Sequence, residues 1–220
     1  MMNIHDLTDA FQKAADPEKA SIMAAYMKHH FDFLGIRSPE RRVISTPFLK
    51  AWEAGRKPVD WGLIHELWER PEREYQYVGI DYLKKSARFL MPGEFEDMKS
   101  IIMKKSWWDS IDNLASGPVG QMILNAPNQV TTMDAWIRDE NLWVRRTAII
   151  HQLSYKDQTD EERLFTYCRM HSGDSEFFIA KAIGWALREY GKTNPEAVLK
   201  FVDETPLQKL SKREALKHLR

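Results

Sequence analysis

The amino-acid sequence predicts an all-helical fold, in which helical hairpins stack into a curved solenoid with a concave, basic groove. Nearly every segment places its apolar residues at the 3.6-residue period of an α-helix, and no convincing alternating strand is present. Glycine and proline stand mostly between these segments, where they are typical of helix ends. The third observation is a regular spacing of 35 residues between segment starts.

Residues 35 positions apart open, or nearly open, successive predicted helices. These register positions are Ser38, Arg73, Trp108, Trp143, Phe178 and Arg213. Thirty-five residues suffice for two helices and two turns, which is the size of a hairpin repeat that buries its apolar face only by stacking on its neighbours. The alternative is a non-repetitive helical bundle with coincidental spacing. The regularity over all these positions favours the solenoid, and we expect one domain over residues 1–220.

The helices that carry the register can be followed along the chain. They are predicted within residues 37–52, 70–85, 104–115, 140–153 and 175–192. In the third segment, KKSWWDSIDNLA, an apolar stripe contains Trp107, Ile111 and Leu114. A second stripe, turned by about 100°, contains Trp108 and Asp112. The sequence therefore places a large indole one turn before a carboxylate, away from the core stripe.

The later segments add cations and another indole in the same register. Residues 175–192 carry Lys181, Trp185 and Arg188 on one stripe, apart from the apolar stripe of that helix. Arg146 interrupts the apolar helix within 140–153. Asp112, Arg146 and Lys181 lie within one residue of a common row at the 35-residue spacing. Basic residues interleaved with exposed aromatics along a groove suit a polyanion.

Composition limits the classes of function. The chain has 220 residues and equal numbers of acidic and basic side chains, so a nucleic-acid partner would need a surface that is basic on one face only. The single cysteine, Cys168, excludes an intramolecular disulfide. The histidines form no spaced ligand set, and we expect no metal. Without a signal peptide or a membrane-spanning apolar run, we expect a cytoplasmic protein that does not contact membranes.

Three runs of the sequence closely resemble one known family. The runs KSWWDSIDNLA, NLWVRRTAIIHQLSYKDQTD and FFIAKAIGWALREYGKTNP are similar to the AlkD family of alkylpurine DNA glycosylases, and the resemblance covers essentially the whole chain. It implies HEAT-like repeats whose concave basic face holds duplex DNA. It also implies hydrolysis of the N-glycosidic bond of cationic purines such as 7-methylguanine and 3-methyladenine. We expect the chain to act as a monomer without a cofactor.

The resemblance assigns roles to residues of this chain. It makes Asp112 the catalytic carboxylate and places Trp108 and Trp185 against the deoxyribose. Arg146 matches the active-site arginine, which holds either a DNA phosphate or the carboxylate of Asp112. The adjacent Arg145 leaves an ambiguity of one residue. The cations expected to contact DNA are Lys181, Arg188, Arg145, Lys104 and Lys105. For the lysine pair, a solvated helix face is the alternative.

The residue types suit this chemistry. A cationic purine leaves as a neutral base, so a general acid is not required, and one carboxylate can stabilise the electron-poor sugar and orient water. No lysine stands in the catalytic run, so we expect base release without strand cleavage, and the resemblance implies that the lesion stays in the duplex.

The alternatives to a glycosylase are a non-catalytic repeat protein that binds duplex or branched DNA, and a scaffold that binds proteins. Tyr26 is expected to pack in the core, with DNA contact as the alternative.

Overall fold

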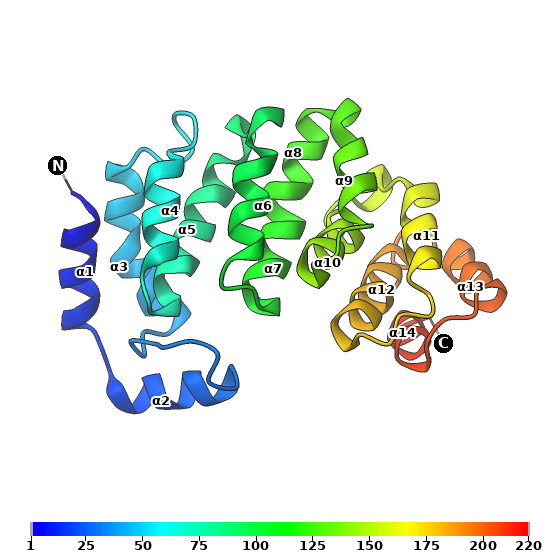
Figure 1. Ribbon diagram of the computed structural model, residues 1–220, viewed down its shortest axis with the longest axis horizontal. Coiled ribbons are helices and arrows are strands. Elements are labelled where there is room, and N and C mark those ends of the chain that lie inside the picture. The colour runs from blue at the N-terminus through cyan, green and yellow to red at the C-terminus, as the bar shows by residue number, and fades with distance from the viewer. Residues whose placement is uncertain (1, 220) are drawn as a thin grey trace. The chain divides into compact units, whose positions relative to one another are not determined.

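The computed structural model describes residues 2–219, and this part of the chain is all-helical, as the sequence predicts (Figure 1). The α-helices are α1 (Ile4–Lys13), α2 (Pro17–Tyr26), α3 (Ser38–Ala51), α4 (Trp61–Glu69), α5 (Arg73–Ser86), α6 (Phe95–Met103), α7 (Trp108–Leu114), α8 (Gly120–Asn125), α9 (Thr131–Trp136), α10 (Leu142–Ile150), α11 (Glu161–Met170), α12 (Phe177–Tyr190), α13 (Pro195–Glu204) and α14 (Lys209–Ala215). Short 3-10 turns are η1 (Ala87–Phe89), η2 (Pro92–Glu94), η4 (Pro127–Val130) and η5 (Lys156–Gln158). Within residues 2–219, no helix has both the length and the apolar character needed to cross a bilayer.

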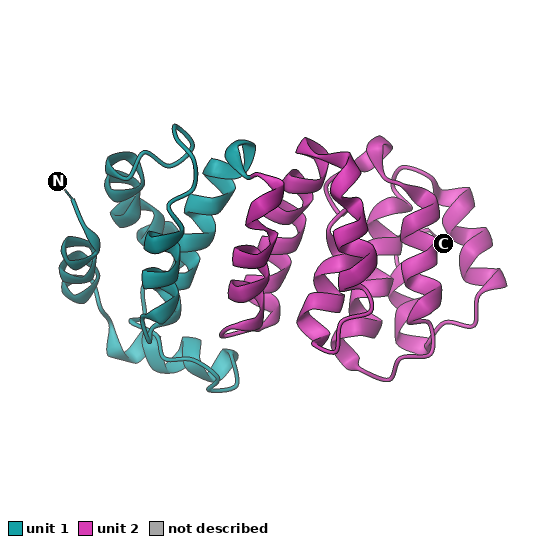
Figure 2. Ribbon diagram, turned by 45° about the horizontal axis from the view of Figure 1, so that its top comes forward, with its two compact units in different colours: residues 1–90 teal, residues 91–220 magenta. Residues whose placement is uncertain are grey.

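The chain divides into two compact units, residues 1–90 and 91–220 (Figure 2). In the first unit, α3 packs on both α1 and α5, and α4 packs on α5. The buried carboxylate of Glu74 in α5 accepts hydrogen bonds from the backbone N–H groups of Leu34, Gly35 and Ile36, which ties the loop before α3 to this core. Helix α2 has no buried residue, and Tyr26 at its end is 71% exposed. The prediction that Tyr26 packs in the core is therefore wrong.

In the second unit, helices one repeat apart pack directly on one another. Helix α7 contacts α10, α10 contacts α12, and α12 contacts α14. These helices begin at Trp108, Leu142, Phe177 and Lys209. The 35-residue register therefore marks helix starts to within one residue for α7, α10 and α12, and it also marks the starts of α3 and α5. It is wrong for Arg213, which lies inside α14 because that helix begins four residues earlier.

Gly117 and Pro118 do not end a helix, although their sequence is typical of a boundary. The chain remains helical from α7 through a single π-helical turn, η3 (Ala115–Val119), into α8. The wider π-turn accommodates a residue that lacks a backbone N–H, and such turns are frequent at functional sites. The hydroxyl of Ser116 donates a 2.7 Å hydrogen bond to the carbonyl oxygen of Asp112. The turn is thus joined to the helical segment that carries the candidate catalytic carboxylate.

The buried side chain of His151, which follows α10, makes the stability of the fold depend on pH. Its ring is 1% exposed, and burial lowers its pKa to about 4. An unfolded chain binds a proton at this histidine near pH 6.5, whereas the folded chain does not, so stability is greatest above pH 6.5 and falls as the pH drops toward 4. We expect His151 to remove about 2 kcal/mol of unfolding free energy between pH 7 and pH 5. Urea titrations should show this loss reduced in His151→Gln, and equal losses in both proteins would contradict the assignment.

Candidate active site

A cavity of about 280 Å³ opens where the successive helices α7, α10, α12 and α14 meet. The side chains that line it combine aromatic rings with charges of both signs. They are Trp108, Asp112, Arg146, Phe177, Phe178, Lys181, Trp185, Arg188 and Glu214. The cavity therefore contains all four residues that the sequence predicts as catalytic and two of the cations predicted to bind DNA.

A bidentate ion pair joins two neighbouring helices at this cavity. Nε of Arg146 lies 2.8 Å from Oδ1 of Asp112, and Nη2 lies 3.0 Å from Oδ2. The remaining nitrogen, Nη1, donates a 2.5 Å hydrogen bond to the carbonyl oxygen of Phe178. Such paired N–H···O contacts fix the plane of a carboxylate as well as its position. Since all three guanidinium nitrogens are engaged, the geometry favours the alternative in which Arg146 holds Asp112 over the one in which it holds a phosphate.

Burial and the ion pair act on Asp112 in opposite directions. Its side chain is only 16% exposed, and this burial raises the pKa of the carboxyl above its ordinary value. The hydrogen bonds and the positive charge of Arg146 oppose that rise, while the nearby charge of Asp109 adds to it. On balance the pKa of Asp112 is raised, so the negative charge of this carboxyl depends strongly on the hydrogen bonds and the positive charge of Arg146.

Local sequence explains how the ion pair is positioned. The side chain of Asn141 caps α10 by accepting hydrogen bonds from the N–H groups of the next helix turn, which starts the helix one turn before Arg146. The rings of Trp107, Trp143 and Phe178 form a cluster with centroid separations of 4.9–5.6 Å. This cluster joins α10 and α12 to the residue preceding α7. It therefore fixes the start of α7 and with it the side chains that α7 contributes to the cavity.

Two indoles, Trp108 and Trp185, line the same cavity as Asp112. Both are partly exposed, as expected for side chains off the apolar stripes, whereas Ile111 and Ile183 on those stripes are fully buried. Trp108 stands one turn before Asp112 on α7, and Trp185 stands one turn after Lys181 on α12. The electron-rich face of an indole attracts a nearby cation. The cavity is thus lined by a carboxylate and two indoles, groups that can attract a positive charge.

A second group of charges lies in the cavity, and one of its members, Glu214, was not predicted from the sequence. The carboxylate of Glu214 in α14 lies 2.7 Å from Nη1 of Arg188 and 3.1 Å from Nζ of Lys181. Partial burial alone raises the pKa of Glu214, but the hydrogen bonds from Lys181 and Arg188 outweigh it and the pKa is lowered. Glu214 is therefore ionised at neutral pH. Its surroundings in the sequence, KREALKHLR, resemble a solvated helix face and gave no signal.

The other predicted DNA-binding cations do not line this cavity. Nη1 of Arg145 donates hydrogen bonds of 2.7 and 2.8 Å to the carbonyl oxygens of Asp139 and Glu140. Lys104 is exposed and Lys105 half-exposed, just after α6. Position therefore separates the two adjacent arginines: Arg146 contacts Asp112, whereas Arg145 stabilises the chain before α10. A role of Arg145, Lys104 and Lys105 in binding DNA stays a prediction.

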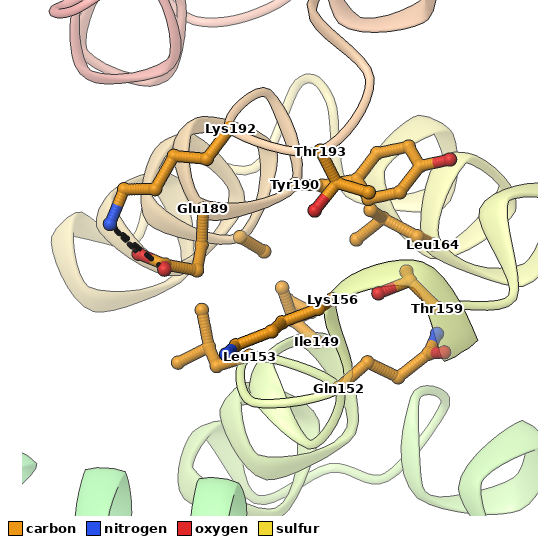
Figure 3. A pocket seen from close by; sticks show the side chains of 11 residues that line it. Ile149, Gln152, Leu153, Lys156, Thr159, Leu164, Glu189, Tyr190, Lys192 and Thr193 are labelled. Carbon is orange, nitrogen blue, oxygen red and sulfur yellow. Dashed lines mark hydrogen bonds and ion pairs between the residues drawn. The ribbon is translucent and has the colours of Figure 1, made fainter.

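A second cavity in the same unit, of about 200 Å³, has a different character (Figure 3). Ile149 and Leu164 contribute apolar surface to its lining. The close-up shows Glu189 paired with Lys192, and Nζ of Lys192 lies 2.8 Å from Oε2 of Glu189. Gln152 exchanges hydrogen bonds with the backbone of Asp160. Among the described residues that line this cavity, Glu189 is the only one with a carboxylate, which is already paired, and none is a tryptophan. Among residues 2–219, no three His, Cys, Asp or Glu side chains gather as metal ligands.

The fold and the cavity together define a class: helical-repeat proteins with an aromatic, charged site between successive repeats. A family model described as "DNA alkylation repair enzyme" matches residues 7–219, and the chain belongs to this family. The resemblance seen in the sequence is thereby confirmed. A solved structure, "Predicted DNA alkylation repair enzyme from Enterococcus faecalis", is 36% identical and superposes with a TM-score of 0.87, covering 93% of this chain and 96% of that chain. No curated protein matches the chain.

Proposed function

We propose that this protein is a DNA glycosylase that hydrolyses the N-glycosidic bond of cationic alkylated purines, such as 7-methylguanine and 3-methyladenine, in duplex DNA. The observation that carries the proposal is the carboxylate of Asp112, held by two hydrogen bonds from Arg146 in a cavity that Trp108 and Trp185 also line. Membership of the DNA alkylation repair family supports DNA as the substrate.

The charges in the cavity agree with this reaction. An alkylated purine already carries the positive charge that protonation would otherwise supply, so it leaves as a neutral base. The sugar then becomes electron-poor, and the negative charge of Asp112 stabilises it and orients the attacking water. The other carboxylate, Glu214, is held ionised by two cations and is unsuited to act as a general acid. A reaction with a cationic leaving group requires only one catalytic carboxylate.

The indoles supply the second part of the stabilisation. Their faces attract the cationic sugar, an effect worth about 0.5–2 kcal/mol for each ring. We predict that Trp185→Leu lowers the single-turnover rate of 7-methylguanine release about tenfold, because the apolar volume remains while the electron-rich face is lost. A rate in Trp185→Leu equal to that of the wild type would show that this ring does not contact the reacting sugar.

Base release without strand cleavage is also part of the proposal. Sequence reasoning found no lysine in the catalytic run, but the structure places Lys181 in the cavity. Its amine lies 3.1 Å from the carboxylate of Glu214 and forms an ion pair with it. An amine that is engaged in this ion pair is not available to attack the sugar. The reaction therefore ends at an abasic site, and the open cavity agrees with a lesion that stays in the duplex.

The decisive experiment measures free base and strand breaks in parallel. Purified protein is incubated with duplex DNA that carries 7-methylguanine, and the released base is quantified by chromatography. Strand breaks are measured on the same DNA with and without hot alkali. We expect free base, and breaks only after alkali. DNA binding without base release would instead identify a non-catalytic repeat protein, and absence of DNA binding would favour a scaffold that binds proteins.

A further inference from the structure

Glu214 is placed in the cavity by unusually close packing of α14 on α12. A Cβ added at Gly184 in α12 would lie 2.5 Å from Cβ of Glu214 and 2.9 Å from the carbonyl oxygen of Ser211, so only glycine permits this approach. The buried hydroxyl of Ser211 donates a 2.8 Å hydrogen bond to the carbonyl oxygen of Ala180. The position of Glu214 between Lys181 and Arg188 is therefore fixed by the backbones of two helices.

This carboxylate changes the charge that the cavity presents. Arg146, Lys181 and Arg188 supply three positive charges against the negative charges of Asp112 and Glu214, which leaves a net charge of +1. Without the charge of Glu214 the net charge would double. The pair formed by Asp112 and Arg146 is internally matched, so Lys181 and Arg188 are the cations of this cavity that remain for a DNA phosphate. Glu214 contacts both of them.

We propose that Glu214 is a positioning residue that holds Lys181 and Arg188 together and restrains their binding to the phosphates of undamaged DNA. This inference rests on the proposed function. A phosphate that approaches the two cations must share them with the carboxylate of Glu214 or displace it, so part of the electrostatic attraction is already used within the protein. A weaker hold on undamaged duplex lets a repair enzyme leave the sites that carry no lesion.

The test compares Glu214→Gln with wild-type protein in binding to an undamaged duplex. Fluorescence anisotropy over a range of salt concentrations should show a Kd about five- to tenfold lower for Glu214→Gln, with the salt dependence steeper by about one phosphate contact. Tighter binding together with the steeper salt dependence is the readout that supports the proposal, because a merely structural role of Glu214 would not increase the attraction to phosphates.

Glu189→Gln is the matched control, because it removes the same charge from the helix that carries Arg188. Glu189 pairs with Lys192 at the other cavity (Figure 3), and we expect its Kd to change less than about twofold. Equal tightening in both variants would overturn the proposal, since net charge alone would then explain it. Unchanged or weaker binding by Glu214→Gln would overturn it as well.

A double variant, Lys181→Gln with Glu214→Gln, tests whether Lys181 is one of the cations that Glu214 restrains. It restores the net charge of +1 in the cavity, and its Kd should return to within about twofold of wild type. If its Kd were as low as that of Glu214→Gln, Lys181 would not be a cation whose phosphate binding Glu214 restrains. The proposed function is tested separately, because base release is measured with the wild type and does not involve the affinities of these variants for undamaged DNA.

Discussion

Asp112→Asn should lower the rate of 7-methylguanine release by at least about 100-fold, while binding to duplex DNA is retained. The substitution keeps the shape of the side chain and one oxygen for Arg146 but removes the negative charge that, in the proposed function, faces the cationic sugar. Removal of a preorganised electrostatic group from a catalytic site commonly costs two to three orders of magnitude. Single-turnover release at saturating protein measures this effect without interference from product release.

The variant should remain folded, since burial already favours the neutral form of Asp112. Its melting temperature, measured beside that of the wild type, checks this point. Asp203→Asn is the matched control: it makes the same chemical change at an exposed position of α13 outside the cavity, and its rate should stay within about twofold of wild type. If Asp112→Asn retained more than about a tenth of the wild-type rate, Asp112 could not be the main source of transition-state stabilisation.

The row of candidate site residues could be predicted from the sequence because stacked repeats align equivalent positions. Asp112, Arg146 and Lys181 recur at nearly the same position of successive repeats, and the helices that carry them pack one on the next. Helical periodicity separated these residues from the apolar stripes, on which Ile111 and Ile183 are fully buried. The 35-residue register and the helical periodicity together therefore identified most of the residues that line the cavity.

Features that depend on contacts between distant helices could not be predicted in the same way. Glu214 reaches the cavity because α14 begins at Lys209, earlier than the register predicts, and because Gly184 allows its backbone to approach. A sequence of mixed charges cannot show such an approach. The sequence also could not show which of Arg145 and Arg146 contacts Asp112. Neighbouring residues on a helix differ by about 100° in direction, and only tertiary contacts decide which one faces Asp112.

The chain through Gly117 and Pro118 shows how a strong local signal can be overridden. This dipeptide is typical of a helix end, yet both residues lie in the π-turn η3 between α7 and α8. Pro118 and Val119 are buried there, and a Cβ added at Gly120 would lie 2.6 Å from the carbonyl oxygen of His151. Tertiary packing on the segment that follows α10 thus keeps the chain helical where local preference favours a break.

Arg146→Gln should move the acidic limb of the pH–rate profile toward higher pH. Without the guanidinium, burial acts on Asp112 unopposed, so the pKa of this carboxyl rises further and a smaller fraction is ionised at neutral pH. Loss of an adjacent opposite charge shifts such a group by about 1–3 pH units. Because the proposed function requires the ionised carboxylate to stabilise the sugar, we expect base release at pH 7 to fall at least about 30-fold and to recover in part at pH 9.

Arg145→Gln separates this effect from a general loss of positive charge. Arg145 is the adjacent residue on α10, but its guanidinium bonds the carbonyl oxygens of Asp139 and Glu140 outside the cavity. Its acidic limb should coincide with that of the wild type, although its melting temperature should fall because these contacts are lost. Suppose instead that Arg146→Gln lowers the rate by one constant factor from pH 5 to pH 9. The arginine would then act on the DNA rather than on Asp112, and the bidentate ion pair would have to open when DNA binds.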